Sequence, residues 1–288
     1  MKLCRSWMFV PGHIAKMVQK SSVVPTDGTM LDIEDGVLPA FKAQARQIIA
    51  QEVPKMAETG QTRFVRINAI SQAEFKLDLD AMVGLNIAGV VLPKVESAGE
   101  VLEAAAGLET LERARGVNRQ LRIVVAIESA RGVIAANLIA TASERVVGLM
   151  LGAEDLARDI GLPAQRVAEA HELIYARSAL VMAATAARIQ SIDQVWPNLS
   201  DVEGLYRDAV QARRLGFTGK AIIHPSQIED VNAAFSPTSA DIDFARRVIA
   251  AFDEAEEKGL GAVSFGGQLL DKPIVDRARA VLEINRSA

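Results

Sequence analysis

The chain has 288 residues, of which 50% are hydrophobic and 24% charged, and its formal net charge is −4. This composition is typical of a globular protein with one large domain or two small ones, and the lack of basic runs argues against a nucleic-acid binder. The single cysteine, Cys4, excludes a disulfide framework or a thiolate metal site within one chain. No stretch reads as a signal peptide or a membrane span, so we expect a cytoplasmic protein with no nucleic-acid or membrane partner.

Short apolar runs with the length of buried strands recur eight times along the chain. They are Trp7–Val10, Thr29–Ile33, Arg63–Ile67, Gly89–Leu92, Arg122–Ile127, Val146–Leu151, Ser191–Val195 and Lys220–Ile223. Segments with a helical pattern lie between them, at Ala40–Ala57, Ala73–Met82, Ala98–Leu111, Ala164–Ile189 and Asp201–Leu215. This alternation predicts an α/β protein whose parallel strands close into a (β/α)8 TIM barrel. A doubly wound open sheet is the alternative, but the first run is not followed by the G-x-G-x-x-G fingerprint of a dinucleotide fold.

The chain continues beyond the eighth run for about sixty residues, which is more than a barrel needs. We expect a short helix at Gln227–Ala234, a longer one at Ala240–Lys258, a Gly-rich passage at Gly259–Pro273 and a last helix at Ile274–Ile284. The Gly-rich passage has two interpretations: a mobile lid packed on a neighbouring subunit, or a plain surface hairpin, which the composition alone favours. The predicted organisation is a barrel over residues 1–225 and a C-terminal helical and lid extension over residues 226–288.

Polar and ionisable residues follow every predicted strand, and in a barrel of parallel strands this edge carries the chemistry. Glu128 and the pair Glu154–Asp155 follow two neighbouring strands and suggest oxygen ligands for a hard divalent cation. The alternative is that these acids cap the helices that follow them.

Three further residues at this edge have open interpretations. Lys94 either takes part in the chemistry or neutralises nearby acids, and Asp193 either caps a helix or pairs with an arginine. His224 is equally well a core histidine or a ligand-contacting one.

A divalent cation with open coordination positions can bind a hydroxy or keto acid and stabilise a developing alkoxide or enolate. Arg66, at the end of an adjacent strand, could clamp a carboxylate or an enolate oxygen. Lys94 and Lys220 stand only at strand edges, so no lysine is placed inside a strand as a Schiff-base nucleophile. We therefore favour metal-dependent aldol-type cleavage, while a phosphate-handling lyase stays open.

Eight short motifs run in order from Arg5 to Pro273. They are R-S-W-M-F-V-P-G, L-D-I-E-D-G-V with Lys42 and Arg46 downstream, V-R-I-N, V-L-P-K-V, A-I-E-S-A-R-G, L-G-A-E-D-L, G-F-T-G-K-A-I-I-H-P-S-Q-I and G-G-Q-L-L-D-K-P. Together they make the chain resemble the citrate lyase β-subunit-like family, the CoA-ester lyases of the HpcH/HpaI aldolase superfamily.

The resemblance implies Mg²⁺, with Mn²⁺ as an alternative ion, held by Glu128 and Asp155 with Glu34 and Asp35 in or near the outer shell. It also implies that Arg66 contacts the reacting substrate. The residues implied to contact the CoA ester are Phe9, Lys16, Ile223 and His224. Asp271 takes the place of the family's lid aspartate, which acts as acid/base at the site of an adjacent subunit, so a homotrimer or hexamer is expected.

The implied reaction is Mg²⁺-dependent cleavage of a 3-hydroxyacyl-CoA of the malyl-CoA or citramalyl-CoA type. The C2–C3 bond breaks, Arg66 offsets the charge of the thioester enolate, and Asp271 protonates it. The products are acetyl-CoA and a 2-keto acid such as glyoxylate or pyruvate.

Three alternatives stay open beside this reaction. The first is a citrate lyase β subunit acting on a carrier-bound citryl thioester, and the second is a CoA-independent aldolase of hydroxy keto acids. The third is a catalytically silent binding protein. Phe9 and His13 replace the Tyr and Asn of some relatives, and Gln268 and Leu269–Leu270 precede Asp271, which affects the expected specificity.

Overall fold

The computed structural model describes residues 3–57, 59–163 and 170–287. The chain divides into two compact units, residues 1–231 and residues 232–288. Each unit is built around its own set of contacts and is described separately.

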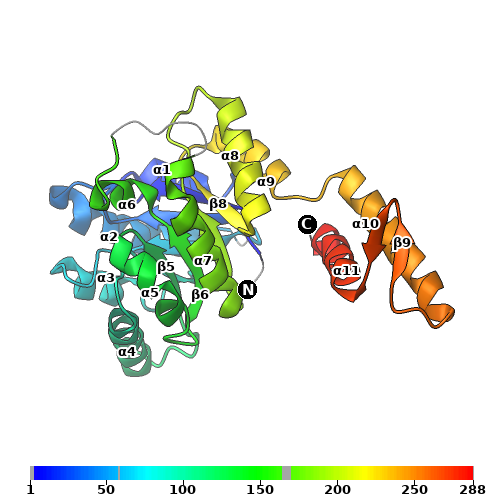
Figure 1. The fold of residues 1–288 in the computed structure, drawn as a ribbon. Helices are drawn as coiled ribbons and strands as arrows, with labels where there is room; N and C mark the ends of the chain where they lie inside the picture. The colour runs from blue at the N-terminus through cyan, green and yellow to red at the C-terminus, as the bar shows by residue number, and fades with distance from the viewer. Residues whose placement is uncertain (1–2, 58, 164–169, 288) are drawn as a thin grey trace. The chain divides into compact units, whose positions relative to one another are not determined.

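The first unit is a closed barrel of eight parallel strands in sequence order, with helices around it (Figure 1). The strands are β1 (Ser6–Pro11), β2 (Gly28–Asp32), β3 (Thr62–Arg66), β4 (Gly89–Leu92), β5 (Arg122–Ile127), β6 (Val146–Leu151), β7 (Gln190–Asp193) and β8 (Gly219–Ile222). β8 pairs with β1 in parallel and closes the sheet. The (β/α)8 barrel predicted from the alternation of apolar runs is thereby confirmed.

Every strand contributes at least one apolar side chain to a cluster that fills the barrel. These side chains are Trp7, Met30, Phe64, Val91, Val124, Met150, Ile192 and Ala221. The rings of Trp7 and Phe64 pack with their centroids 5.3 Å apart. Neighbouring strand residues point outward against the helices, so the strands are buried on both faces and read as continuous apolar runs in the sequence.

Among the α-helices in the part of the chain that the structure describes, the first nine accompany the barrel strands. They are α1 (Ala15–Ser21), α2 (Lys42–Glu52), α3 (Glu74–Met82), α4 (Ala98–Ala114), α5 (Ala130–Ala140), α6 (Ala153–Asp159), α7 (Ile174–Ala186), α8 (Val202–Leu215) and α9 (Ile228–Ala234). The helix expected over Ala40–Ala57 is shorter because Pro39 and Pro54 confine its ends to 3-10 turns. α8 ends at Gly216 in the left-handed region, with φ of 104°, as its sequence predicts. Residues 164–169 of the helix expected over Ala164–Ile189 lie outside the described residues.

None of the helices in the described part of the chain combines the length with the apolar composition that crossing a bilayer requires.

The second unit is a pair of helices joined by a hairpin. It contains α10 (Ser239–Glu257), β9 (Val263–Phe265), β10 (Gln268–Leu270) and α11 (Lys272–Ser287). β9 and β10 pair in antiparallel fashion, and the two residues between them, Gly266 and Gly267, both have positive φ. Two successive positive φ angles suit the tight turns that match strand twist. The surface-hairpin interpretation of the Gly-rich passage therefore holds for its local structure.

Candidate active site at the carboxyl ends of the strands

The carboxyl ends of neighbouring strands bring together most of the charged residues that the sequence singled out. Asp32 and Arg66 are the last residues of β2 and β3 and stand opposite each other in the strand register. Lys94 lies two residues beyond β4, and Glu128 follows β5 directly. These residues share one edge of the barrel because parallel strands end on the same side.

The guanidinium of Arg66 is held on three sides. Its Nε and Nη2 donate to the two carboxylate oxygens of Asp32, both at 2.7 Å, and its Nη1 lies 3.2 Å from Oε2 of Glu34. The Phe9 ring lies against it, with 4.7 Å from the guanidinium carbon to the ring centroid. Burial lowers the pKa of Arg66, but the two carboxylates outweigh burial and raise it. Arg66 is thus a fixed cation with N–H groups on Nη1 and Nη2 left for a ligand.

Asp32 organises the turn that follows β2 as well as Arg66. Its two oxygens accept hydrogen bonds from the backbone N–H groups of Glu34 and Gly36, each at 3.0 Å. A Cβ atom at position 36 would overlap Oδ2 of Asp32, so the turn requires glycine there. The glycine of the E-D-G motif therefore follows from the space that the Asp32 carboxylate occupies.

Lys94, which follows β4, binds the two acids that follow β2. Its Nζ donates to Oε1 of Glu34 at 2.5 Å and to Oδ2 of Asp35 at 2.7 Å. Glu34 is fully buried, whereas the side chain of Asp35 is half exposed. The interpretation that Lys94 neutralises nearby acids is confirmed. Glu34 forms ion pairs with both Arg66 and Lys94.

Glu128 is a buried carboxylate in an acidic neighbourhood. Burial, the Glu34 carboxylate and, more weakly, the Asp155 carboxylate raise its pKa to about 8, against the opposing charge of Arg66. Glu128 does not cap the next helix, because Ser129 is the N-cap and accepts from Gly132. The capping alternative is therefore wrong for Glu128.

The side chain of Glu128 extends over the end of β6. A Cβ atom at position 152 would overlap Cγ of Glu128 and lie only 2.8 Å from its Cδ. Gly152 is therefore required at this position because a larger residue would displace the carboxylate.

Asp155 lies in the first turn of α6, where an acid interacts favourably with the helix dipole. Its side chain is not the cap of the helix, since the N-cap is Gly152. Oδ1 of Asp155 pairs with Arg158 at 2.5 Å, and the aspartate side chain is 21% exposed. The neighbouring Glu154 is exposed. Asp155 therefore combines partial burial with access to solvent.

The donor set at this edge fits a hard divalent cation. Five carboxylates interact with three cationic side chains, so two negative charges are unbalanced once Glu128 has lost its proton. The members are Asp32, Glu34, Asp35, Glu128, Asp155, Arg66, Lys94 and Arg158. Among the described residues, no group of three or more His, Cys, Asp or Glu side chains is arranged to hold a metal. Two carboxylates with open positions for water and substrate suit Mg²⁺, which rarely binds in a closed protein cage.

The residues predicted to contact the CoA ester differ in their surroundings. Phe9 lies on Arg66, whereas Lys16 on α1 is exposed. Ile223 is 39% exposed, and His224 is exposed with Nδ1 2.8 Å from Oγ of Ser226. The core-histidine interpretation of His224 is wrong, because the residue follows β8 at the open edge of the barrel.

Asp271 lies in the second unit, directly after β10, and is exposed. Its Oδ1 accepts a long hydrogen bond, 3.4 Å, from the backbone N–H of Ile274 in the first turn of α11. It therefore caps α11, and its carboxylate stays accessible.

A buried network behind β3 escaped the sequence analysis. Asn68 donates from its backbone and its side chain to Oδ2 of Asp78, at 2.8 and 2.6 Å, and accepts from Lys42. Arg46 donates to Oδ1 of Asp78 at 2.8 Å. Lys42 and Arg46 thus anchor the loop that follows Arg66. The spacing of Lys42 and Arg46 places them on one face of a helix, which could have indicated a shared partner. Nothing in the sequence around Asp78 identified it as that partner.

Lys220 does not stand at a strand edge, as the sequence analysis assumed, but inside β8, where it is fully buried. Its Nζ donates to Asp193 at 2.8 Å and to Asp208 at 2.5 Å, and Arg177 pairs with both acids. Ala221, the next residue, faces the barrel interior, so Lys220 points outward to the helices. The predicted pairing of Asp193 with an arginine is confirmed, and Lys220 has two carboxylate partners rather than a substrate carbonyl.

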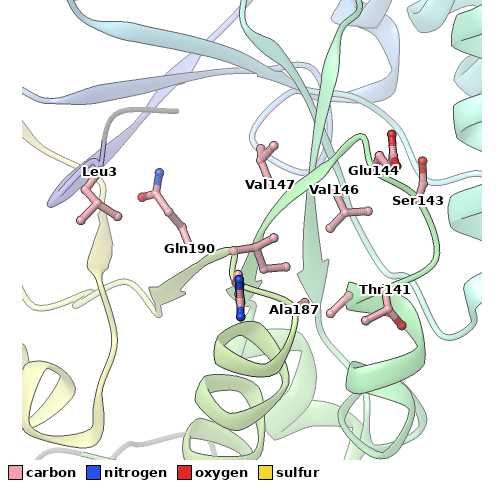
Figure 2. A pocket seen from close by; sticks show the side chains of 11 residues that line it. Leu3, Thr141, Ser143, Glu144, Val146, Val147, Ala187 and Gln190 are labelled. Atoms are coloured by element: carbon pink, nitrogen blue, oxygen red, sulfur yellow. The ribbon is translucent and has the colours of Figure 1, made fainter. Parts of the chain in front are cut away.

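A cavity of about 560 Å³ lies at the other end of the barrel. Figure 2 shows its lining by Val146 and Val147 at the start of β6, Gln190 at the start of β7, and Leu3 before β1. None of the predicted site residues lines this cavity. In barrels of this type the amino-terminal end serves stability, so the carboxyl edge remains the candidate site.

The chain resembles known proteins over its whole length. Residues 5–225 match the family described as HpcH/HpaI aldolase/citrate lyase. Citrate lyase subunit beta of Haemophilus influenzae is 40% identical over 288 residues, which cover 100% of this chain and 98% of that protein. Mitochondrial citramalyl-CoA lyase of Mus musculus is 31% identical over 295 residues, which cover 98% of this chain and 86% of that protein.

Solved structures show the same similarity. CitE from Mycobacterium tuberculosis, in complex with magnesium, acetoacetate and coenzyme A, has a TM-score of 0.80 and 34% identity over 97% of each chain. A citrate lyase beta subunit from M. tuberculosis, complexed with oxaloacetate and magnesium, has a TM-score of 0.68 and 34% identity, covering 81% of this chain and 96% of that one. The sequence resemblance is thereby confirmed. The chain belongs to the HpcH/HpaI aldolase/citrate lyase family, and it is a carbon–carbon lyase.

Proposed function

We propose that this protein is a Mg²⁺-dependent lyase that cleaves a 3-hydroxyacyl-CoA of the malyl-CoA or citramalyl-CoA type. The products are acetyl-CoA and a 2-keto acid such as glyoxylate or pyruvate. The observation that supports this proposal most is the arrangement of Glu128 and Asp155 beside an arginine fixed by Asp32 and Glu34. The magnesium, acetoacetate and coenzyme A bound to the CitE relative agree with this chemistry.

In the proposed site, Glu128 and Asp155 hold Mg²⁺, and Glu34 and Asp35 lie in the outer shell. The bound cation supplies Lewis-acid stabilisation to the oxygen atoms of the hydroxy acid and of the keto acid. Phe9, Lys16, Ile223 and His224 bind the CoA ester. Because Glu34 already pairs with Arg66 and Lys94, it acts on the site through these cations.

The reaction follows from the charges that these residues place around the substrate. The 3-hydroxyl gives its proton to the Asp271 carboxylate, the C2–C3 electron pair moves into the thioester, and C3 becomes the carbonyl carbon of the keto acid. The free N–H groups of Arg66 stabilise the thioester enolate oxygen, because a fixed cation needs no reorganisation when the charge develops. Asp271 delivers a proton to C2 and yields acetyl-CoA.

We infer that Asp271 performs this step at the site of an adjacent subunit, within a homotrimer or hexamer. The barrel has surface for such association. Ile134 and Leu138 on α5 and Tyr175 and Met182 on the adjoining α7 are all more than half exposed. Exposed apolar side chains gathered on neighbouring helices mark a surface for contact between proteins.

A second candidate function is that of a citrate lyase β subunit acting on a carrier-bound citryl thioester. It is favoured by the 40% identity with citrate lyase subunit beta of H. influenzae, which is higher than the identity with the citramalyl-CoA lyase. The two functions share the same bond cleavage and differ in the carrier of the thioester and in the keto acid that leaves.

The test is acetyl-thioester release from malyl-CoA, citramalyl-CoA and a citryl thioester on an acyl carrier protein, with and without Mg²⁺. Asp271→Asn is expected to lower kcat by about 10²-fold or more, as expected for loss of an acid/base group. Asp276→Asn, an exposed acid on α11, serves as the matched control and leaves kcat unchanged. Release from the carrier thioester alone would replace the first candidate by the second.

A further inference from the structure

Lys94 is held in a costly backbone conformation at the edge of the site. Its φ of 56° lies in the left-handed region, which is unfavourable for residues other than glycine. Strain of this kind persists where the surrounding structure needs a particular side chain, and it gathers at functional sites. The side chain of Lys94 is 29% exposed, so it belongs neither to the core nor to the open surface.

Glu34 connects Lys94 to the fixed arginine. Its Oε1 accepts from Lys94, and its Oε2 faces Nη1 of Arg66 at 3.2 Å. Because Glu34 is fully buried, these two cations and the backbone N–H of Asp35 supply its partners. Removal of Lys94 would leave Arg66 as the only neighbouring cation described for this buried carboxylate.

We propose that Lys94 is a positioning residue that, through Glu34, keeps Arg66 on Asp32 and offsets the negative charge around Glu128 and Asp155. The effect on catalysis rests on the proposed function. The effect on cation binding rests on the arrangement of charges alone.

The proposal predicts opposite shifts for two ligands of one site. Without the Lys94 ammonium, the site becomes more negative, so a divalent cation binds more tightly. The unbalanced Glu34 draws Arg66 away from Asp32, so an anionic substrate binds and reacts less well. A merely structural role would weaken both together.

Three variants separate the side chain from the backbone. Lys94→Met removes the ammonium and keeps the strain, Lys94→Gly removes the ammonium and relieves the strain, and Lys94→Arg keeps a cation. Arg113→Met, which breaks an exposed pair with Glu109 on α4, is the matched loss of one positive charge. The double variant Lys94→Met with Glu34→Gln removes both charges of the Lys94–Glu34 pair.

The readouts are kcat and KM for acetyl-CoA release and the Mg²⁺ affinity from calorimetry. Both Lys94→Met and Lys94→Gly are expected to lose about 10- to 100-fold in kcat/KM, as for other residues that orient a metal site. Both are expected to bind Mg²⁺ about two- to fivefold more tightly. Lys94→Arg should retain most of the activity, and Arg113→Met should match the wild type. In the double variant, the added Glu34→Gln should raise kcat/KM several-fold above that of Lys94→Met alone.

A kcat/KM within twofold of the wild type in Lys94→Met and Lys94→Gly would overturn the proposal. So would an unchanged or weaker Mg²⁺ affinity in these variants, or a double variant no better than Lys94→Met. If the wild-type protein released acetyl-CoA from no ester, the proposed function would fail. The Mg²⁺ titrations would still decide the role of Lys94.

Discussion

Arg66 shows how single residues create the conditions for chemistry here. Asp32 accepts from Nε and Nη2 along one edge of the guanidinium, Glu34 pairs with Nη1, and Phe9 covers its face. The plane and the five donors of arginine are needed for this arrangement, and lysine supplies neither. Arg66→Lys is therefore expected to lower kcat by about 10²- to 10³-fold, the usual effect of losing a donor to a developing oxyanion. Steady-state kinetics measure the loss in kcat, and the melting temperature shows whether the variant stays folded. A kcat within threefold of the wild type would show that the guanidinium does not act on the substrate.

Glu128 gives the site a defined pH dependence. In the absence of a cation, burial and the Glu34 and Asp155 carboxylates raise the pKa of Glu128 to about 8, so it carries a proton at neutral pH. Mg²⁺ binding must displace this proton, and its affinity is expected to rise about tenfold per pH unit below pH 8 and to level off above it. Calorimetry in buffers of different ionisation enthalpy counts the released protons. Glu128→Gln should abolish the dependence, and a wild-type affinity independent of pH from 6 to 8 would contradict it.

The same group affects folding without the cation. Its pKa is raised above the unfolded value of 4.5, so between these two values the folded state binds more protons than the unfolded one. Stability contributed by this group is present below the unfolded pKa and is lost as pH rises through the folded pKa.

Residue positions at this edge were predictable from the sequence only where a strand end placed them. Glu128 and Arg66 follow apolar runs, and so their common edge could be predicted. The bidentate pairing of Asp32 with Arg66 could not be predicted, because it depends on the register between β2 and β3. Asp78 lies within α3, where its sequence position gives no sign of burial.

At the scale of elements, a buried network of ion pairs connects the last two strands of the barrel with the helices α7 and α8. Arg177 on α7, Asp193 on β7, Asp208 on α8 and Lys220 on β8 are all fully buried, with two charges of each sign. The sequence analysis placed Lys220 at a strand edge because it opens the apolar run. The outward direction of its side chain became visible only once the strand bounds were known.

Breaking this network is expected to be costly. Lys220→Met leaves Asp193 and Asp208 with a single cation, and removal of one partner from a buried pair costs about 3–5 kcal/mol. Urea denaturation measures the loss, and the double variant Lys220→Met with Asp208→Asn should recover part of it by removing the unbalanced charge. Arg207→Met, next to Asp208 but on the exposed face of α8, is the control and should leave the midpoint unchanged. An equally small effect of Lys220→Met would mean that the network does not stabilise the barrel.

At the scale of the whole molecule, the eightfold alternation of apolar runs and helices predicted the barrel, because each strand is buried on both faces. The relation of the second unit to the site could not be predicted from periodicity. Its Gly266–Gly267 turn and the cap formed by Asp271 are local features, and a role for Asp271 in catalysis depends on how subunits assemble.

Mixed oligomers test whether Asp271 serves an adjacent subunit. Asp271→Asn and Glu128→Gln subunits are each expected to be inactive when expressed alone. In co-expressed hybrids, about a quarter of the sites would combine an intact Glu128 with an intact Asp271 from a neighbour, so about a quarter of the activity should return. Activity no higher than that of the separate variants would place Asp271 outside a shared site.

The measurement that tests the account most directly is a Mg²⁺ titration of acetyl-CoA release from malyl-CoA and citramalyl-CoA by the wild type, Glu128→Gln and Glu154→Gln. Glu154 is the exposed acid beside Asp155 and serves as the matched control. The account predicts no release without Mg²⁺, saturable release by the wild type and Glu154→Gln, and a loss of about 10²-fold or more in Glu128→Gln. Equal release with and without Mg²⁺, or full activity in Glu128→Gln, would contradict it.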